Sequence, residues 1–352
     1  MNFIHRKASR TIGLVAVLAA IAAGIAVEAG NAASSAPAGK SSYAPKAKFK
    51  APKLKGGLLT ITGTKASDKI ALRLQAGDPS MLQVDVGDDG SADFYFQRSA
   101  IAKIAVNSRA GNDLVRIDES NGAFTDSIPT RIDGGDGNDT IAGGKGIETL
   151  LGGRGNDSID GNGGNDVARL GPGNDTFVWD PGDGSDTVEG QAGADTMLFN
   201  GANASEQVDV SANGNRLKFF RNPGNITMDT AGVERVDFNA LGGADVVTVN
   251  DLTGTDVSTV NVDLAGTLGG AAGDGQADRV VVNATNGNDT IDVSGDAEVA
   301  KVSGLAATTR VLHSEAANDR LEINTLAGAD TVGSAGLTAG AIKLFLDGVL
   351  VA

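Results

Sequence analysis

The sequence predicts an all-β protein built of stacked coils, because a short repeat and flanking strand patterns both favour this fold class. Between residues 134 and 199, acidic residues recur about every nine positions, and an apolar residue usually follows two positions later. Short alternating runs of Val, Ile and Leu flank this segment, and 41% of the residues are hydrophobic. Alternation of this kind is typical of half-buried strands. High charge can indicate disorder, but these apolar runs favour a folded β protein.

The charge of the chain limits its partners. The 352 residues carry a formal net charge of −15 and include no cysteine. From Gly56 to the C-terminus, 20 Lys and Arg stand against 43 Asp and Glu. A body this acidic excludes nucleic acid and anionic lipid as expected partners, and it attracts cations instead. Without cysteine, no disulfide braces the fold.

Residues 1–33 have the pattern of a secretory signal peptide. Three basic residues precede an apolar stretch over residues 12–27, and small residues that fit a cleavage site follow. An uncleaved anchor is the alternative, although 16 apolar residues are short for a membrane span. We therefore expect a secreted, extracellular or cell-surface protein with no stable membrane span after signal cleavage. Residues 34–57, rich in Pro, Ala and Lys, are predicted to form a semi-rigid linker.

The nine-residue repeat predicts a flattened solenoid. Residues 134–142 read GGDGNDTIA and residues 152–160 read GGRGNDSID, so the unit is G-G-x-G-x-D-x-U-x, where U is apolar. One nonamer has a single inward apolar position, so copies must stack. If two nonamers make one coil, residues 18 apart lie about 4.8 Å from each other. The acids then follow two edges, with Asp139, Asp157, Asp175 and Asp195 on one and Glu148, Asp166 and Asp186 on the other.

Stacked carboxylates at this spacing favour a bound cation. Each neighbouring pair about 5 Å apart repels by roughly 1 kcal/mol in water and by more in a less polar setting. Turn glycines adopt left-handed conformations and expose backbone carbonyls. Ca²⁺ prefers such an all-oxygen environment. Zinc is disfavoured, because the chain has no cysteine and only His313 lies beyond the targeting segment.

The repeats resemble the hemolysin-type calcium-binding (RTX) repeat family over residues 134–199. This resemblance implies a parallel β-roll that holds Ca²⁺ between consecutive turns. Glu148 departs from the family pattern and shares its turn with Lys145, so it is a weaker metal candidate. The ligands that the resemblance implies are the carboxylates of Asp139, Asp157, Asp166, Asp175, Asp186 and Asp195, with backbone carbonyls from turn glycines such as Gly135, Gly137, Gly153, Gly155, Gly164 and Gly173.

A longer repeat predicts the structure of the flanks. Residues 234–245, 278–289 and 319–330 each contain an acid, Arg, alternating apolar residues, Asn at the sixth place and a final Gly-x-Asp. Residues 102–113 fit the same frame. We expect β-solenoid-like coils over residues 58–133 and 200–352, with a β-sandwich as the alternative. Asp278 is not flanked by acids 18 residues away on both sides, so it is expected to lie outside any ladder. The final turns add the weaker metal candidates Asp113, Asp245, Asp289 and Asp330, for which ordinary Asp turns are the favoured interpretation.

A further acidic segment lies near the start of the predicted folded region. Residues 84–96 read VDVGDDGSADFYF, and their alternating acids Asp85, Asp89 and Asp93 resemble a portion of a calcium loop. A β-hairpin with an Asp-Gly turn explains the segment as well. These three acids are therefore weaker metal candidates.

No set of residues predicts catalysis. The one His beyond the targeting segment, His313, has a Glu nearby but no triad, and neither a nucleophile elbow nor a phosphate loop is present. The favoured hypothesis is a secreted protein in which Ca²⁺ is structural. The alternatives are a polysaccharide-modifying β-solenoid enzyme with an RTX module, and an adhesion protein of the cell surface or matrix. Calcium ions are the expected partner, and an envelope or matrix polysaccharide stays open as a second one.

Overall fold

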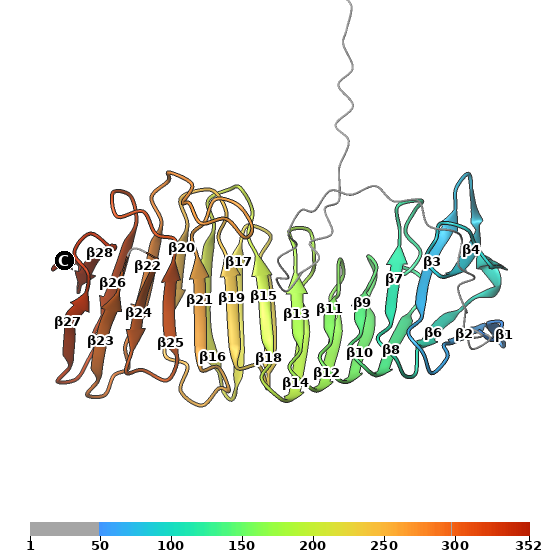
Figure 1. Ribbon diagram of the computed structural model, residues 1–352, viewed down its shortest axis with the longest axis horizontal. Helices are drawn as coiled ribbons and strands as arrows, with labels where there is room; N and C mark the ends of the chain where they lie inside the picture. The colour runs from blue at the N-terminus through green and yellow to red at the C-terminus, as the bar shows by residue number, and fades with distance from the viewer. Residues whose placement is uncertain (1–48, 297) are drawn as a thin grey trace, which may run out of the picture. The chain divides into compact units, whose positions relative to one another are not determined.

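The computed structural model describes residues 49–296 and 298–352, and the core of this region is lined by two long sheets (Figure 1). The predicted signal peptide and most of the predicted linker lie outside the described residues. The described residues belong to one compact unit. Sheet A has 15 strands and sheet B has 14.

In spatial order, sheet A contains β1 (Lys53–Lys55), β2 (Leu58–Thr62), β6 (Lys103–Asn107), β8 (Thr130–Asp136), β10 (Glu148–Arg154), β12 (Val167–Pro172), β14 (Thr187–Ala192), β18 (Ile226–Ala231), β17 (Arg216–Asn222), β16 (Gln207–Asn213), β20 (Val246–Val249), β22 (Arg279–Asn283), β26 (Arg320–Asn324), β28 (Lys343–Leu346) and β29 (Val349–Leu350). Sheet B contains β27 (Thr331–Leu337), β23 (Thr290–Gly295), β24 (Val299–Ser303), β25 (Thr308–Leu312), β21 (Thr259–Asp263), β19 (Arg235–Asn239), β15 (Thr196–Asn200), β13 (Thr176–Trp179), β11 (Ser158–Asp160), β9 (Thr140–Ala142), β7 (Leu114–Asp118), β3 (Lys69–Gln75), β4 (Asp78–Val86) and β5 (Phe94–Gln97). A single 3-10 turn, η1 (Arg98–Ala100), follows β5.

The chain alternates between the two sheets, and successive coils pair in parallel. Thr149 of β10 lies beside Arg131 of β8, and Ser158 of β11 lies beside Thr140 of β9, so the register advances by 18 residues per coil. After the two-residue insertion at Trp179, the register advances by 20. This confirms a solenoid in which two nonamers make one coil.

The flanks continue both sheets of the roll. Parallel pairing runs from β16 through β20, β22 and β26 to β28 in sheet A, and from β15 through β19 and β21 to β25 in sheet B. The preferred solenoid flanks are thus confirmed, and the alternative of β-sandwich flanks is wrong. Antiparallel hairpins interrupt the coils where the chain is longer, at β3–β5, β16–β18 and β23–β25.

The core lies between the sheets, and each nonamer of the roll contributes the apolar residue that follows its acid by two positions. The apolar positions Ile141, Leu150, Ile159, Ala168 and Phe177 are all buried. Larger side chains take over where the roll meets the C-terminal flank. There Trp179 stacks on Phe199 with ring centroids 3.9 Å apart, and Phe219 and Phe238 pack beside them. Burial of aromatic surface on this scale contributes more to stability than the small side chains of the nonamers.

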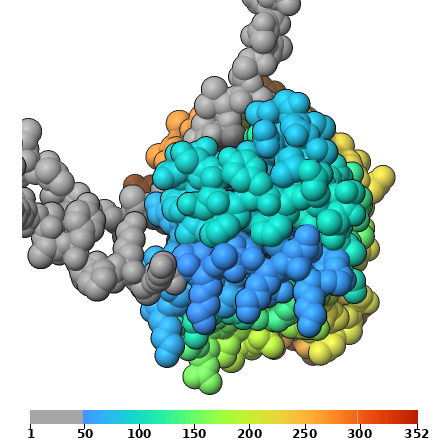
Figure 2. Space-filling model, turned by 90° about the vertical axis from the view of Figure 1, so that its right-hand side faces the viewer, coloured from blue at the N-terminus to red at the C-terminus, as the bar shows by residue number. Residues whose placement is uncertain are grey.

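The N-terminal end of the solenoid is covered by its own hairpins. Figure 2 looks onto this end, where segments coloured blue to cyan cover the coils behind them. β1 pairs antiparallel with β2, so Lys53–Lys55 form a strand within the segment predicted to be a linker. The ordered fold therefore begins before Gly57.

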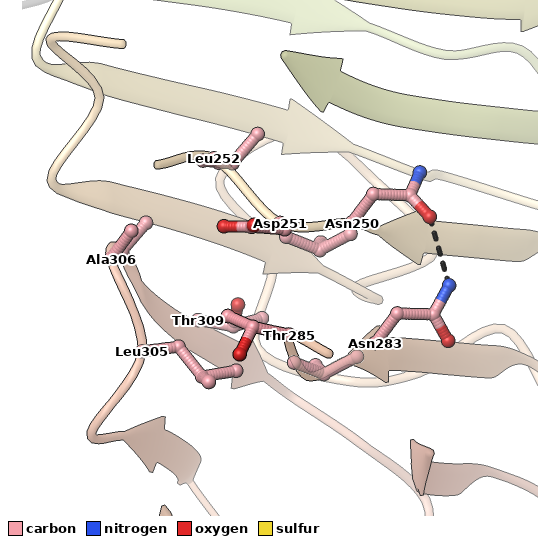
Figure 3. Close-up of a pocket in the computed structure, with 11 residues that line it drawn as sticks. Asn250, Asp251, Leu252, Asn283, Thr285, Leu305, Ala306 and Thr309 are labelled. Atoms are coloured by element: carbon pink, nitrogen blue, oxygen red, sulfur yellow. Dashed lines mark hydrogen bonds between the residues drawn. The ribbon is translucent and has the colours of Figure 1, made fainter. Parts of the chain in front are cut away.

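The Asn at the sixth place of the longer repeat forms a side-chain ladder. Asn324 donates from Nδ2 to Oδ1 of Asn283 at 2.8 Å, and Asn283 donates in the same way to Asn250 at 2.8 Å (Figure 3). Asn250 completes the run by donating to Asp209. The cavity beside this ladder has a volume of about 10 Å³, whereas small-molecule sites occupy about 300–1,000 Å³.

Candidate metal centre

Each acid of the nonamer lies in the turn that immediately precedes a strand. We call the turns that lead from sheet A to sheet B the A-to-B turns, and those that lead back the B-to-A turns. Asp139, Asp157, Asp175 and Asp195 end successive A-to-B turns, and Glu148, Asp166 and Asp186 end B-to-A turns. The two edges expected from the nine-residue spacing are therefore present.

Within each edge, hydrogen bonds connect the acids into a ladder. The backbone N–H of Asp157 donates to Oδ1 of Asp175 at 2.7 Å, and that of Asp166 donates to Oδ1 of Asp186 at 2.8 Å. The following residue reinforces the contact, because the N–H of Thr176 donates to the carbonyl of Asp157. One carboxylate oxygen of each ladder Asp is thus used to hold the neighbouring coil.

The other carboxylate oxygen is buried without a partner. Oδ2 of Asp157 has no hydrogen-bond donor among the described residues, and the residue is 3% exposed. A buried polar atom normally finds a partner, since leaving it unpaired costs about 1–3 kcal/mol, and more when it is charged. The acids with such an orphan oxygen are Asp113, Asp139, Glu148, Asp157, Asp166, Asp175, Asp186, Asp195, Glu206 and Asp245.

The glycines of the turns allow backbone carbonyls to approach the next coil. A Cβ on Gly153 would overlap the carbonyl oxygen of Gly135, and a Cβ on Gly155 would overlap that of Gly137. Gly153 has φ +113, a conformation that L side chains rarely adopt. A Cβ on Gly164 would likewise overlap the carbonyl oxygen of Gly146, and a Cβ on Gly173 would overlap that of Gly155. Columns of carbonyl oxygens therefore run along both rows of turns.

The first glycine of the nonamer has a separate role beside the orphan oxygen. A Cβ on Gly152 would lie within 2.5 Å of Oδ2 of Asp157 and would also overlap the carbonyl of Leu170. A Cβ on Gly134 would meet Asp139 and Gly152 in the same way. At these two positions the absence of a side chain leaves room beside the carboxylate oxygen, whereas Leu170 takes the place of this glycine before Asp175.

A second ladder uses the Asn that precedes Asp139, Asp157 and Asp175, and the sequence reasoning missed it. Oδ1 of Asn138 accepts the N–H of Asn156 at 2.9 Å, and Oδ1 of Asn156 accepts that of Asn174 at 2.9 Å. This ladder runs in the opposite direction to the Asp ladder, so each turn is tied to both neighbours. The available signal was the repeated Asn-Asp pair, which the consensus recorded as an unspecified residue.

Burial disfavours the ionised form of the ladder acids. Desolvation raises the pKa of Asp157 to about 7 and that of Asp166 to about 9. It also raises the pKa of Asp186 and of Asp195 to about 7. The charged neighbours along each ladder add to this effect. Each carboxyl group must therefore gain either a proton or a cation.

These residues fit an oxygen-bound cation and exclude a site made of side chains alone. Within the described residues, no three His, Asp or Glu side chains are grouped so that they could hold a metal ion. An ion at the turns would thus take most of its ligands from backbone carbonyls, and the orphan carboxylate oxygens would add negative charge. That donor set, with a high proportion of carbonyls, suits Ca²⁺.

Glu148 occupies a ladder position despite its departure from the repeat. Its N–H donates to Oδ1 of Asp166 at 2.6 Å, and its Oε2 accepts the N–H of Gly144 at 2.9 Å. The longer side chain reaches back into its own turn, and Oε1 is orphaned. Lys145 contacts Glu119 and Thr125 through its backbone N–H. Glu148 is the first acid of the B-to-A ladder.

The N-terminal acids form a hairpin turn. Arg73 donates from one guanidinium nitrogen to Oδ2 of Asp85 at 2.8 Å, and the N–H groups of Asp89 and Gly90 also donate to this carboxylate. Asp93 accepts the N–H of Val86. The carboxylate of Asp85 is satisfied by protein donors, so the geometry favours the hairpin interpretation of this segment.

The C-terminal acids form a ladder of their own. The N–H of Asp245 donates to Asp278 at 2.8 Å, and the N–H of Asp278 donates to Asp319 at 3.0 Å. The expectation that Asp278 lies outside any ladder is therefore wrong, because the longer coils place the stacked acids 33 and 41 residues apart rather than 18. Asp289 and Asp330 make the corresponding A-to-B contact at 2.8 Å, and Oδ2 of Asp289 is occupied by Thr285.

An arginine pairs with the acid at one ladder position. Glu206 begins the C-terminal B-to-A ladder, and Arg221 from the inserted hairpin β16–β17 donates to its Oε1 through two guanidinium nitrogens. Both residues are buried, and the guanidinium lies 5.1 Å from the centre of the Trp179 ring. The protein thus supplies its own positive charge where the roll meets the C-terminal flank.

Stacked turns that present carbonyl oxygens and half-paired carboxylates define a repeat protein with a cation-binding fold. Comparison with known families then gives the particular repeat: residues 131–147, 143–177 and 182–203 match the family described as RTX calcium-binding nonapeptide repeat (4 copies). The chain therefore contains RTX repeats, which are calcium-binding motifs, over these residues. Comparison with curated proteins gave no match. Among the described residues, no helix is long and apolar enough to span a membrane.

Proposed function

We propose that this is a secreted calcium-binding protein in which Ca²⁺ at the stacked turns stabilises the solenoid. The proposed ligands are the carboxylates of Asp139, Asp157, Asp166, Asp175, Asp186 and Asp195 and the carbonyls of the turn glycines. The single observation that carries the proposal is the row of buried carboxylate oxygens without a hydrogen-bond donor. A divalent cation would satisfy these oxygens and neutralise the ladder in one step.

The role of the ion is structural in this proposal. The matched strands bury only one or two apolar side chains each, and one of these, Ala168, is small. Binding to the folded state alone adds RT ln(1 + [L]/Kd), which is about 2.7 kcal/mol per site at 100 times the Kd. Several sites together would offset the cost of stacking the acids. When bound, Ca²⁺ supplies charge neutralisation and cross-links between coils.

Export is the natural setting for such a fold. Proteins with RTX repeats are typically secreted, and extracellular calcium modules bind at about 10⁻⁴ to 10⁻³ M. The basic and apolar pattern of residues 1–33 supports export, and the lack of cysteine leaves stabilisation to other devices. We infer that calcium takes the bracing role that disulfides have in many secreted proteins.

A non-catalytic role also belongs to the proposal. One hollow on the described surface has a volume of about 590 Å³ and is lined by one acid, Asp274. Both of its oxygens accept backbone N–H groups, from Gly243 at 2.7 Å and from Gln276 at 2.7 Å. Paired carboxylates of the kind that cleave glycosidic bonds do not line this hollow. Incubation with acidic polysaccharides, followed by size analysis of the glycan, tests whether the protein is non-catalytic.

Calcium titration of matched variants tests the proposed function. Asp139 and Asp136 lie in the same turn, but only Asp139 is buried in the ladder, while Asp136 is exposed. Asp139→Asn removes a charge at the proposed ligand, and Asp136→Asn removes the same charge nearby. We expect weaker or fewer calcium sites by isothermal titration calorimetry in the first variant and wild-type binding in the second. Equal binding by both variants would contradict the assignment.

A further inference from the structure

The turn at residues 108–113 reproduces the metal-binding turn one coil before the matched repeats. It reads SRAGND, whereas the first matched turn, residues 134–139, reads GGDGND. β6 pairs in parallel with β8, so the two turns stack directly. Their acids are 26 residues apart because the intervening coil is longer, and the nine-residue period therefore does not detect the first turn.

Both hydrogen-bond ladders continue into this turn. The N–H of Asp113 donates to Oδ1 of Asp139 at 2.8 Å, as each acid does to the next within the roll. The N–H of Asn138 donates to Oδ1 of Asn112 at 3.0 Å, which extends the Asn ladder in its own direction. The backbone of residues 108–113 is thereby held in the register of the matched turns.

The carbonyl columns also continue. A Cβ on Gly135 would overlap the carbonyl oxygen of Arg109, and a Cβ on Gly137 would overlap that of Gly111. These are the contacts that Gly135 and Gly137 themselves make with Gly153 and Gly155. Arg109 has φ +83, so a residue with a side chain adopts the left-handed conformation that glycine has in the later turns. Such strain persists where the surrounding structure requires the conformation.

The carboxylate of Asp113 adds a further oxygen ligand to the carbonyl oxygens of this turn. The residue is 3% exposed, and its Oδ2 has no hydrogen-bond donor among the described residues. Ser108 takes the place of the first glycine, as Leu170 does in the matched turn that ends at Asp175, and its hydroxyl donates to the carbonyl of Gly134 at 2.7 Å. The carbonyls of Arg109 and Gly111 are unaffected by this substitution.

We propose that the turn at residues 108–113, which lies outside the matched repeats, holds a further Ca²⁺ together with the first matched turn at residues 134–139. The inference rests on the proposed function, since it assigns the same chemistry to one more pair of coils. The column ends at the next turn towards the N-terminus. There a Cβ on Gly111 would meet the carbon and nitrogen of the Ala66–Ser67 peptide bond before it met the carbonyl oxygen. In addition, Oδ2 of Asp68 accepts the N–H of Thr64 at 2.5 Å.

The stoichiometry of calcium binding tests this site in the full chain. Asp113→Asn preserves an oxygen that can accept the N–H of Asp68 but replaces the orphan oxygen by an amide nitrogen. Asp68→Asn is the matched control one coil earlier. By calorimetric titration, Asp113→Asn should bind one calcium ion fewer per chain than the wild type, and Asp68→Asn should bind the wild-type number. Wild-type stoichiometry and affinity in Asp113→Asn would overturn the site.

A second measurement needs no variant. In crystals of the full chain grown with CaCl₂, anomalous scattering should give a peak between residues 108–113 and 134–139, and none between residues 63–68 and 108–113. Peaks at the later turns without one at Asp113 would overturn this site alone. A chain that binds no calcium in either experiment would overturn the proposed function, and the further site with it.

Discussion

The backbone N–H of Asp139 donates to Oδ1 of Asp157, 18 residues later, at 2.8 Å. The two oxygens of the Asp157 carboxylate therefore have different roles. Oδ1 accepts the hydrogen bond from the adjacent coil, whereas Oδ2 has no hydrogen-bond donor. A ladder of such contacts fixes the spacing of the turns through hydrogen bonds. It also creates the row of unpaired oxygens to which we assign calcium.

Substitution of a turn glycine tests the close approach of the coils. Gly153 and Gly182 both have positive φ, but only Gly153 lies against a carbonyl oxygen of the next coil. Gly182→Ala should cost about 1–2 kcal/mol through backbone strain alone. Gly153→Ala should cost about 1–3 kcal/mol more through overpacking. Denaturant unfolding of both variants in calcium measures the difference, and equal losses would show that the close contact is unimportant.

Asp157→Ala should reduce calcium binding more than Asp278→Ala. Both acids lie in ladders, but Asp157 lies within the matched repeats and has an orphan oxygen, whereas Asp278 is not among the acids with an orphan oxygen. The loss at Asp278 should therefore appear in stability, through its bonds to Asp245 and Asp319. Calorimetric stoichiometry separates the two effects. A larger loss of calcium in Asp278→Ala would place the sites in the C-terminal flank instead.

The stabilisation by calcium should increase with pH. Burial raises the pKa of Asp157 to about 7 and that of Asp166 to about 9, both above the value of about 3.9 for an unfolded Asp. A raised pKa in the folded state favours folding below about pH 4, and this contribution is lost as the pH rises through 7 to 9. The calcium-free roll should thus be more stable at pH 5.5 than at pH 8.5.

Calcium binding has the opposite pH dependence, because the cation replaces the proton. The difference in melting temperature between calcium and chelator should therefore be larger at pH 8.5 than at pH 5.5. Melting curves at the two pH values, with and without calcium, provide the comparison. A difference that is independent of pH would mean that the ladder acids do not bind the ion.

Removal of the Arg221 guanidinium should lower the free energy of unfolding, and added calcium should not restore it. Arg221 neutralises Glu206 inside the fold, and both are buried. Arg221→Met leaves the carboxylate unpaired, which costs about 3–5 kcal/mol for a buried pair. The double variant with Glu206→Gln should recover much of this loss. If Arg221→Met unfolds at the wild-type denaturant concentration, the pair has no role in stability.

The sequence predicted the roll more completely than its surroundings, for physical reasons. A strict nine-residue period places Asp139, Asp157 and Asp175 on one edge, because the register between these coils is 18 residues each time. In the flanks, inserted hairpins make the coils unequal, so the stacking of Asp245 on Asp278 left no periodic signal. The Asn ladder was missed because Asn138 was treated as a variable position. The linker was predicted too long because Lys53–Lys55 gain their structure from pairing with β2.

Trp179 fluorescence, followed together with circular dichroism during calcium titration, tests the central claim most directly. Trp179 is buried at the C-terminal end of the roll, stacks on Phe199 and donates to the carbonyl of Gly184 at 2.8 Å. Starting in chelator, calcium should shift the emission cooperatively as the β signal rises in step. Magnesium should have little effect, because it keeps its waters and requires a tighter octahedron. Unchanged emission and β signal between chelator and millimolar calcium would contradict calcium-dependent folding of the roll.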